Sequence, residues 1–329
     1  MGGLKRSLAW FAMALVAMTA TACGDPGKSD SAKGGQSVRL SIATGGVSGV
    51  YYVFGGAYAA IISKTIPGYV ATAEVTAASV DNLRLVGAKK SAVAFTLVDM
   101  AADAVAGKGA FKQPVPVRAL ARLYTTYVQV VAADDRIRTV ADLKGKRVSL
   151  GSPGSGAEVV ALRILKAAGI NPAKDIKRTG LGIGESASAL GDGSIDAFFW
   201  TGGLPTPGIT ELATTHKIHV IPTADFVAPL RKAYGDVYSV SAVPAGAYKG
   251  VTAAVPVMGI ENLLVVHADM PEDEAYKLTK VLFEHKAELA KVHPEAKNLD
   301  LKAAQVTGAV PLHPGAQRYY AEATASASK

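Results

Sequence analysis

The segment TGGVSGVYY (Thr44–Tyr52) lies where a strand gives way to a helix, and it decides which fold the sequence predicts. The residues before it, VRLSIA (38–43), alternate apolar with polar side chains, which is the period of a strand. After it, apolar residues between positions 53 and 62 recur at helical spacing. Three glycines at such a turn either only make the turn tight, or leave backbone N–H groups and the positive end of the helix dipole free to bind an anion.

A second glycine-rich loop, GSPGSGAE (Gly151–Glu158), repeats this pattern in the middle of the chain. No lysine follows Gly156, so the loop is not the phosphate loop of nucleotide hydrolases, and neither Ser152 nor Ser155 sits in a G-x-S-x-G nucleophile elbow. Backbone N–H groups and two hydroxyls without a charged side chain suit a carboxylate held by hydrogen bonds. Two such loops in separate parts of the chain predict a cleft that both parts line.

The rest of the chain alternates strands with helices, which predicts an α/β protein with a largely parallel sheet. Two long extended runs, Val117–Ala133 and Val255–Val266, lie about 130 residues apart and read as crossings between two lobes. We therefore expect lobe 1 to contain residues 38–127 plus 256–329, and lobe 2 to contain residues 128–255.

The N-terminus predicts export from the cytoplasm. Lys5 and Arg6 precede an apolar run from Leu8 to Ala20, and small residues follow, as in a signal peptide that covers residues 1–22. The apolar run is too short to span a bilayer, which needs about 20 residues.

Cys23 is the only cysteine of the chain, which excludes an internal disulfide and a multi-cysteine zinc site. The preceding Ala20-Thr21-Ala22 resembles a lipoprotein signal box, in which the cysteine becomes the first mature residue and carries lipid. The alternative is ordinary secretion. Residues 23–37 are too polar to bury a core and predict a flexible tether. We expect the protein on the outer face of the cytoplasmic membrane, anchored by the lipid on Cys23, in the periplasm or at the cell surface.

The charged residues exclude several classes of function. The net charge is +8, but the basic residues are scattered without the runs that favour nucleic-acid binding. No paired carboxylates and no Ser/His/Asp or Cys/His arrangement stand out, so we expect neither an enzyme nor a cofactor. His285 and Glu288 could share a helix face as metal ligands, but nearby lysines favour an ordinary solvated helix, and we expect no metal.

Taken together, the motifs resemble the TAXI family, the solute receptors of tripartite ATP-independent periplasmic (TRAP) transporters. The resemblance covers Val38 to Ala321, with the Gly-Val-Tyr-Tyr turn and the Asp-Ala-Phe-Phe segment as its most specific parts. The segments that carry it are ATGGVSGVYYVFGGAYAAII, AASVDNLRLV, DLKGKRVSLGSPGSGAEVVALRIL, GDGSIDAFFWTGGLPTPGITELA and VPAGAYKGV.

The resemblance implies a two-lobed type II periplasmic-binding-protein fold that closes on a small carboxylate or amino acid. Glutamate, glutamine or a related dicarboxylate is the substrate class associated with relatives, and TRAP membrane subunits are the implied partners. The alternative is the same fold used as a surface ligand sensor or an immunogenic surface lipoprotein without transport.

Matched onto this chain, the family's cleft implies a set of ligand-binding residues from both lobes. They are Thr44, Gly45, Gly46, Ser48, Gly49, Tyr51, Tyr52, Ser79, Asn82, Thr96 and Asp99 from lobe 1, and Ser152, Ser155, Gly156, Trp200, Thr201 and Gly202 from lobe 2.

The solute's carboxylate is expected at one end of this set. We expect Ser152, Ser155 and the backbone N–H groups that begin the following helix to bind it. Arg84 and Arg163 lie inside helices past their first turns, so they are expected to face solvent rather than the ligand. If Asp99 lies near an anionic solute, its carboxylate needs an ammonium group on that solute as its partner.

Overall fold

The computed structural model describes residues 37–327, which belong to one compact unit. The predicted signal peptide, the lipidated Cys23 and the tether up to residue 36 lie outside the described residues. Within the described part, no helix is long and apolar enough to cross a membrane.

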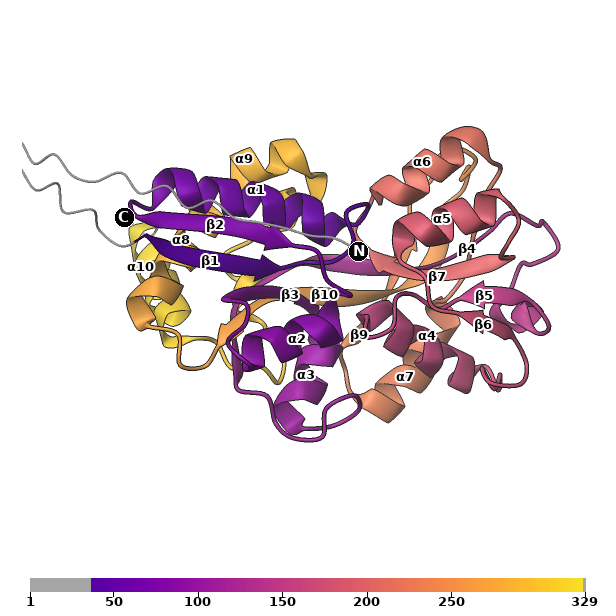
Figure 1. Cartoon of the computed structure of the whole chain (residues 1–329), viewed down its shortest axis with the longest axis horizontal. Helices are drawn as coiled ribbons and strands as arrows, with labels where there is room; N and C mark the ends of the chain where they lie inside the picture. The colour runs from indigo at the N-terminus through magenta and orange to yellow at the C-terminus, as the bar shows by residue number, and fades with distance from the viewer. Residues whose placement is uncertain (1–36, 328–329) are drawn as a thin grey trace, which may run out of the picture. The chain divides into compact units, whose positions relative to one another are not determined.

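A single sheet forms the centre of this unit (Figure 1). Its main path runs in the order β2-β1-β3-β10-β4-β7-β5-β6, with β8 paired to β4 and β9 paired to β10. The strands are β1 (Val38–Ala43), β2 (Tyr69–Glu74), β3 (Val93–Leu97), β4 (Val117–Ala132), β5 (Arg147–Ser149), β6 (Lys177–Thr179), β7 (Ala197–Gly202), β8 (His219–Ile221), β9 (Tyr238–Val243) and β10 (Val255–His267).

Helices cover both faces of the sheet (Figure 1). They are α1 (Val50–Thr65), α2 (Ser79–Gly87), α3 (Val98–Ala106), α4 (Gly156–Ala167), α5 (Ile183–Gly191), α6 (Pro207–Thr215), α7 (Val227–Tyr234), α8 (Glu272–Glu284), α9 (Lys286–Val292) and α10 (Pro314–Ala327). Short 3-10 helices are η1 (Val140–Leu143), η2 (Ala224–Phe226), η3 (Pro294–Asn298) and η4 (Ala303–Gln305).

The two extended runs seen in the sequence are confirmed as the long strands β4 and β10. Each of them pairs with different strands along its two halves. β4 pairs with β10 up to Tyr127 and with β7 from Tyr127 onward. β10 pairs with β9 through its first half and with β3 through its second. We call the part built on β1, β2, β3, α1, α2, α3, α8, α9 and α10 the first lobe, and the part built on β5, β6, β7, β8 and helices α4 to α7 the second lobe. The residue boundaries given above for the lobes stay a prediction.

The sheet is mixed, which corrects the expectation of a largely parallel one. β1 runs parallel to β2 and β3, and β5 runs parallel to β6 and β7. β4 and β10 pair antiparallel with each other and with all their other neighbouring strands. Strand–helix alternation predicts the parallel units within each lobe, but it does not give the direction of the strands that connect the lobes.

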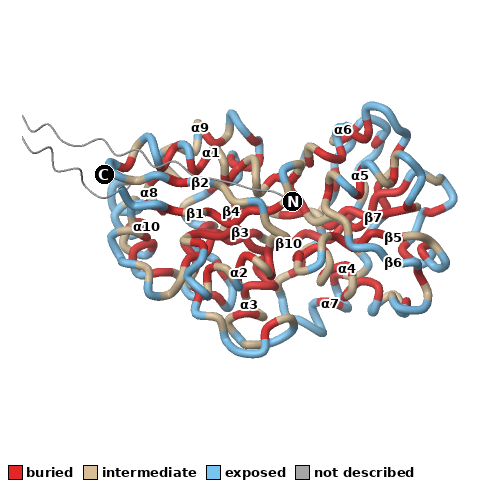
Figure 2. Tube along the Cα trace, viewed as in Figure 1, coloured by how far each residue is buried: buried red, intermediate tan, exposed pale blue. Residues whose placement is uncertain are grey.

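Three buried apolar clusters hold these layers together. Figure 2 shows that the buried residues follow the strands and the inner faces of the helices. One cluster lies in the first lobe under α1, α8 and α10, and another lies in the second lobe under α5 and α6. The third is shared, since it contains Leu83 and Met100 from the first lobe together with Val160 and Ile164 from the second. Burial of each such side chain contributes about 1.5–3 kcal/mol, so this cluster stabilises the arrangement in which α2 and α3 approach α4.

Candidate functional site

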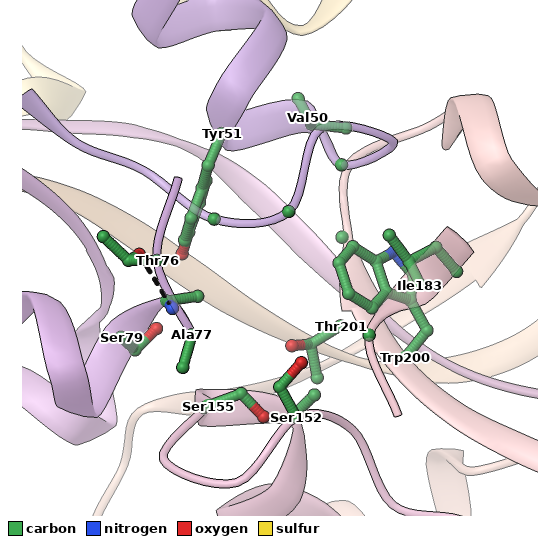
Figure 3. A pocket seen from close by; sticks show the side chains of 18 of the residues that line it. Val50, Tyr51, Thr76, Ala77, Ser79, Ser152, Ser155, Ile183, Trp200 and Thr201 are labelled. Atoms are coloured by element: carbon green, nitrogen blue, oxygen red, sulfur yellow. Dashed lines mark hydrogen bonds between the residues drawn. The ribbon is translucent and has the colours of Figure 1, made fainter. Parts of the chain in front are cut away.

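A cavity lies between the two lobes, at the place where four helices begin (Figure 3). The residues immediately before α1, α2, α4 and α5 all line it, namely Gly49, Ala78, Ser155 and Gly182. About 50 Å³ of it is open to a water-sized molecule, so it suits a small solute. Each lobe contributes two of the four helices.

The cavity wall combines apolar side chains with hydroxyl groups and carries no charged side chain. None of the described residues that line it is Asp, Glu, His, Lys or Arg. The first N–H groups of a helix have no partner within the helix, and the helix dipole places a partial positive charge there. At α1, α2 and α5 no side chain of the capping residue occupies these N–H groups. The cavity therefore concentrates positive potential and hydrogen-bond donors without any cationic side chain, which favours an anion.

Hydroxyl groups on the second lobe add side-chain donors to this wall. Ser152 and Thr201 line the cavity, and neither hydroxyl has a hydrogen-bond partner in the described part of the chain. Ser155 Oγ accepts a hydrogen bond from the backbone N–H of Glu158 at 3.0 Å and so caps α4. Because a capping oxygen accepts, the Ser155 hydroxyl hydrogen can still be donated into the cavity.

Two aromatic side chains form opposite walls of the cavity (Figure 3). Tyr51, from α1, donates its hydroxyl to Oδ1 of Asn262, and burial raises the pKa of Tyr51 so that the phenol stays neutral. Trp200, from β7, donates Nε1–H to Oγ1 of Thr206 at 3.1 Å. The Trp200 ring lies on Gly49 so closely that a Cβ there would be 3.3 Å from Cη2 of the ring. This contact joins the two lobes across the cavity.

Ala78, directly before α2, has a strained backbone in the cavity wall. Its φ of 83° and ψ of −146° fall in a region that residues with a side chain rarely adopt, at a cost of about 1–3 kcal/mol. The Ala78 N–H donates to Oγ1 of Thr76 at 3.0 Å (Figure 3). The Thr76 hydroxyl in turn donates to Oδ1 of Asn82 at 2.6 Å. These two hydrogen bonds hold the strained residue, and with it the start of α2, in place.

Comparison with known proteins places the chain in a family. The model of the NMT1-like family matches residues 42–323, nearly all of the described chain. The chain belongs to the NMT1-like family.

Solved structures show which fold this NMT1-like protein has. A binding protein component of an ABC phosphonate transporter from Pseudomonas aeruginosa aligns with a TM-score of 0.54 at 14% identity, over 79% of each chain. A protein from Bordetella bronchiseptica aligns with a TM-score of 0.53 at 20% identity, over 87% of this chain and 89% of that one. An ancestral arginine-binding protein bound to arginine aligns with a TM-score of 0.50 at 14% identity, over 79% of this chain and 98% of that one. The fold is the two-lobed α/β fold of periplasmic binding proteins.

Eleven of the residues expected at the ligand site of this NMT1-like protein line the cavity. Both glycine-rich loops and the end of β7 contribute to this set. They are Gly45, Gly46, Gly49, Tyr51, Ser79, Ser152, Ser155, Gly156, Trp200, Thr201 and Gly202. Their role in ligand binding stays a prediction.

The other expected residues do not line the cavity. Two of them instead make hydrogen bonds to the backbone of the segments that form its wall. Thr44 is buried and donates Oγ1–H to the backbone oxygen of Glu74 at 2.6 Å. Asn82 is buried beneath the start of α2, where Nδ2 donates to the backbone oxygens of Thr44 at 2.7 Å and Phe95 at 2.8 Å. The full set outside the cavity wall is Thr44, Ser48, Tyr52, Asn82, Thr96 and Asp99.

Asp99 is 2% exposed and lies in an ion pair between the lobes. Its Oδ2 accepts from Nη1 of Arg163 at 2.8 Å and from the hydroxyl of Tyr238 at 2.9 Å, while Arg163 also pairs with Asp103. The expectation that Arg163 faces solvent is therefore wrong, because this side chain is only 7% exposed. Arg84 is exposed as expected, and Nη2 donates to the backbone oxygen of Ala110 at 2.9 Å.

Sequence reasoning missed several residues of the wall. The sequence pattern could have indicated Gly182, because the segment Gly180–Ser186 (GLGIGES) again places a glycine directly before a helix. The carboxylate of Glu185 accepts from the N–H of Gly182 at 3.0 Å, a capping interaction that fixes the start of α5. The missed lining residues are Val50, Thr76, Ala77, Ala78, Tyr124, Gly182 and Ile183, while Ala157 also lines the cavity at the helix start that was expected to bind through its backbone.

Proposed function

We propose that this protein is an extracytoplasmic solute receptor that captures a small carboxylate by closing its lobes and delivers it to the membrane subunits of a TRAP-type transporter. The fold of periplasmic binding proteins, the membership of the NMT1-like family and the resemblance of the sequence motifs to the TAXI family support this proposal. Lipid attachment at Cys23, which lies outside the described residues, would keep the receptor at the outer face of the membrane.

The observation that carries the proposal is the convergence of four helix N-termini on an uncharged cavity. Arginine has a net positive charge, which the positive ends of four helices disfavour, and the described lining residues include no acidic side chain to offset them. A carboxylate needs only donors, which the N–H groups and the hydroxyls of Ser152 and Thr201 offer. Glutamate, glutamine and related dicarboxylates are the solutes that we propose.

Contacts across the cavity support capture by closure. The N–H of Asp81 in α2 donates to the backbone oxygen of Gly154 at 3.2 Å, and the N–H of Gly208 in α6 donates to that of Ser48 at 3.2 Å. Each of these hydrogen bonds links a residue of one lobe to the other. Movement of the lobes away from each other would break both hydrogen bonds, and their re-formation would favour the closed state once a solute is bound.

Binding and compaction can be tested on the same purified protein. Thermal melting is measured with glutarate, L-glutamate and L-glutamine, and a ligand at 100 times its dissociation constant should stabilise the fold by about 2.7 kcal/mol. Small-angle scattering with the stabilising ligand should then show a smaller radius of gyration. A ligand that binds tightly without compaction contradicts closure, and stabilisation by arginine rather than by these solutes contradicts the anion site.

A further inference from the structure

Tyr124 is a buried side chain of the cavity wall whose hydroxyl has no partner. It lies on the crossing strand β4, lines the cavity, and is 2% exposed. Within residues 37–327, no atom accepts from or donates to its hydroxyl oxygen. Folding has removed this hydroxyl from bulk water without replacing the hydrogen bond, which is unfavourable unless a bound molecule supplies one.

Asn262, the polar side chain that contacts the backbone of Tyr124, makes its hydrogen bonds elsewhere and not with the Tyr124 hydroxyl. Nδ2 of Asn262 donates to the backbone oxygen of Tyr124 at 3.0 Å and to Oγ1 of Thr126, and Oδ1 of the same residue accepts from Tyr51. The Tyr124 ring packs against Phe54, with 6.0 Å between the ring centroids, so the ring is held where it is. Burial raises the pKa of Tyr124, which keeps the phenol neutral and able to donate.

We propose that the hydroxyl of Tyr124 donates a hydrogen bond to an oxygen of the bound solute, and that this contact sets which carboxylates bind. The inference rests on the proposed function and deepens it. The helix N-termini attract any small anion, whereas a single hydroxyl on a fixed ring requires an acceptor atom at one place. Since β4 continues from the first lobe into the second, the contact would also attach the solute to the strand that joins the lobes.

The variant Tyr124→Phe tests this inference, with Tyr58→Phe as a matched control. Tyr58 is also buried, but it does not line the cavity, and its hydroxyl donates to the backbone oxygen of Leu278 at 2.7 Å. Without ligand, Tyr58→Phe should lower the melting temperature, whereas Tyr124→Phe should leave it unchanged or raise it. With ligand, Tyr124→Phe should bind about ten- to a hundredfold more weakly, and Tyr58→Phe should bind like the wild type.

Titration calorimetry of all three proteins with glutarate, L-glutamate and L-glutamine gives the dissociation constants. Weaker binding by Tyr124→Phe alone, with its unliganded melting temperature preserved, supports the inference. Equal dissociation constants for Tyr124→Phe and the wild type overturn it and leave the proposed function standing. If none of the three probes binds to the wild type, the proposed function fails, and the role of Tyr124 fails with it.

Discussion

Two arginines in similar sequence settings have opposite environments in the fold. Arg84 and Arg163 both lie within helices, yet only Arg163 is buried, in contact with Asp99 and Asp103. Helical spacing predicts which face of a helix is apolar. It does not predict that Arg163 on that face will form ion pairs with two aspartates of another helix. The partner of Arg163 comes from α3, more than 50 positions earlier, and only the folded arrangement brings them together.

Replacement of Arg163 by leucine should destabilise the protein by about 3–5 kcal/mol, because it leaves the buried carboxylate of Asp99 without its counter-charge. The exposed control, Arg84→Ala, should change the free energy of unfolding by less than about 1 kcal/mol. Urea denaturation of the three proteins measures both values. Similar stabilities for the two variants would contradict a structural role for the ion pair.

Ser152 should contribute directly to carboxylate binding. Its hydroxyl faces the cavity, so Ser152→Ala should weaken binding by about 1.5–3 kcal/mol, the range for a hydrogen bond to a charged group. Ser155 is a poorer test because its loss also removes the cap of α4. Titration calorimetry should show the deficit for Ser152→Ala and none for Arg84→Ala. Normal binding by Ser152→Ala with no binding by Arg84→Ala would place the carboxylate elsewhere.

At the scale of the element, the helix starts were predictable and their convergence was not. The strand–glycine–helix pattern locates the starts of α1 and α4 in the sequence, and the structure has them at Val50 and Gly156. The start of α2 offers only Ala78 in a strained conformation, which no composition rule anticipates. That all these starts meet at one cavity depends on the sheet order, and the sheet order depends on pairings such as β10 with β3.

The start of α4 should tolerate no side chain at its first residue. A Cβ on Gly156 would lie 2.6 Å from Cδ1 of Leu97 and 2.8 Å from Oγ of Ser79, both in the first lobe. Gly156→Ala should therefore hold the lobes apart and weaken ligand binding at least tenfold. Gly56→Ala is the control, since a Cβ there meets no atom within 4 Å and alanine favours the α1 helix by about 1 kcal/mol.

Calorimetry and small-angle scattering distinguish the two glycine variants. Gly156→Ala should keep a larger radius of gyration than the wild type when ligand is present, whereas Gly56→Ala should compact normally. Wild-type affinity in Gly156→Ala would mean that α4 and α2 need not approach each other for binding.

For the whole molecule, buried histidines should make the fold sensitive to acid. Burial lowers the pKa of both His293 and His313 below the ordinary value of 6.5. Below about pH 6.5 the unfolded chain therefore takes up protons that the folded chain does not, which favours unfolding. The stability that these imidazoles contribute is complete above pH 6.5 and is lost as the pH falls through their folded-state pKa values.

Thermal melting at pH 7.5 and pH 5.5 checks this expectation. The wild type should lose melting temperature over this interval, and His313→Gln, which cannot take up a proton there, should lose less. An equal loss in both proteins would exclude His313 as a cause. The comparison uses the difference between two pH values, so it does not depend on how far the substitution itself destabilises the fold.

The two-lobed fold itself was largely predictable from the sequence. The extended runs that became β4 and β10 are long and apolar enough to stand out, and their separation implies a discontinuous first lobe. Residues such as Tyr124 were not predictable as part of the site, because an apolar strand carries no mark of which side chains reach a cavity. The local sequence pattern thus identifies the helices and strands. The wall of the cavity, in contrast, is formed by residues that are far apart in the sequence.

A site made largely of main-chain donors has a consequence for its evolution. Substitution at Ala157 or Ile183 changes a side chain and leaves the peptide N–H where it was, so alanine scanning underestimates such a site. Side chains of the wall can diverge and select a different carboxylate while the attraction for an anion persists. An amide-to-ester replacement at the first turn of α4 or α5 would be the change that removes a donor, since it substitutes oxygen for the N–H and spares every side chain.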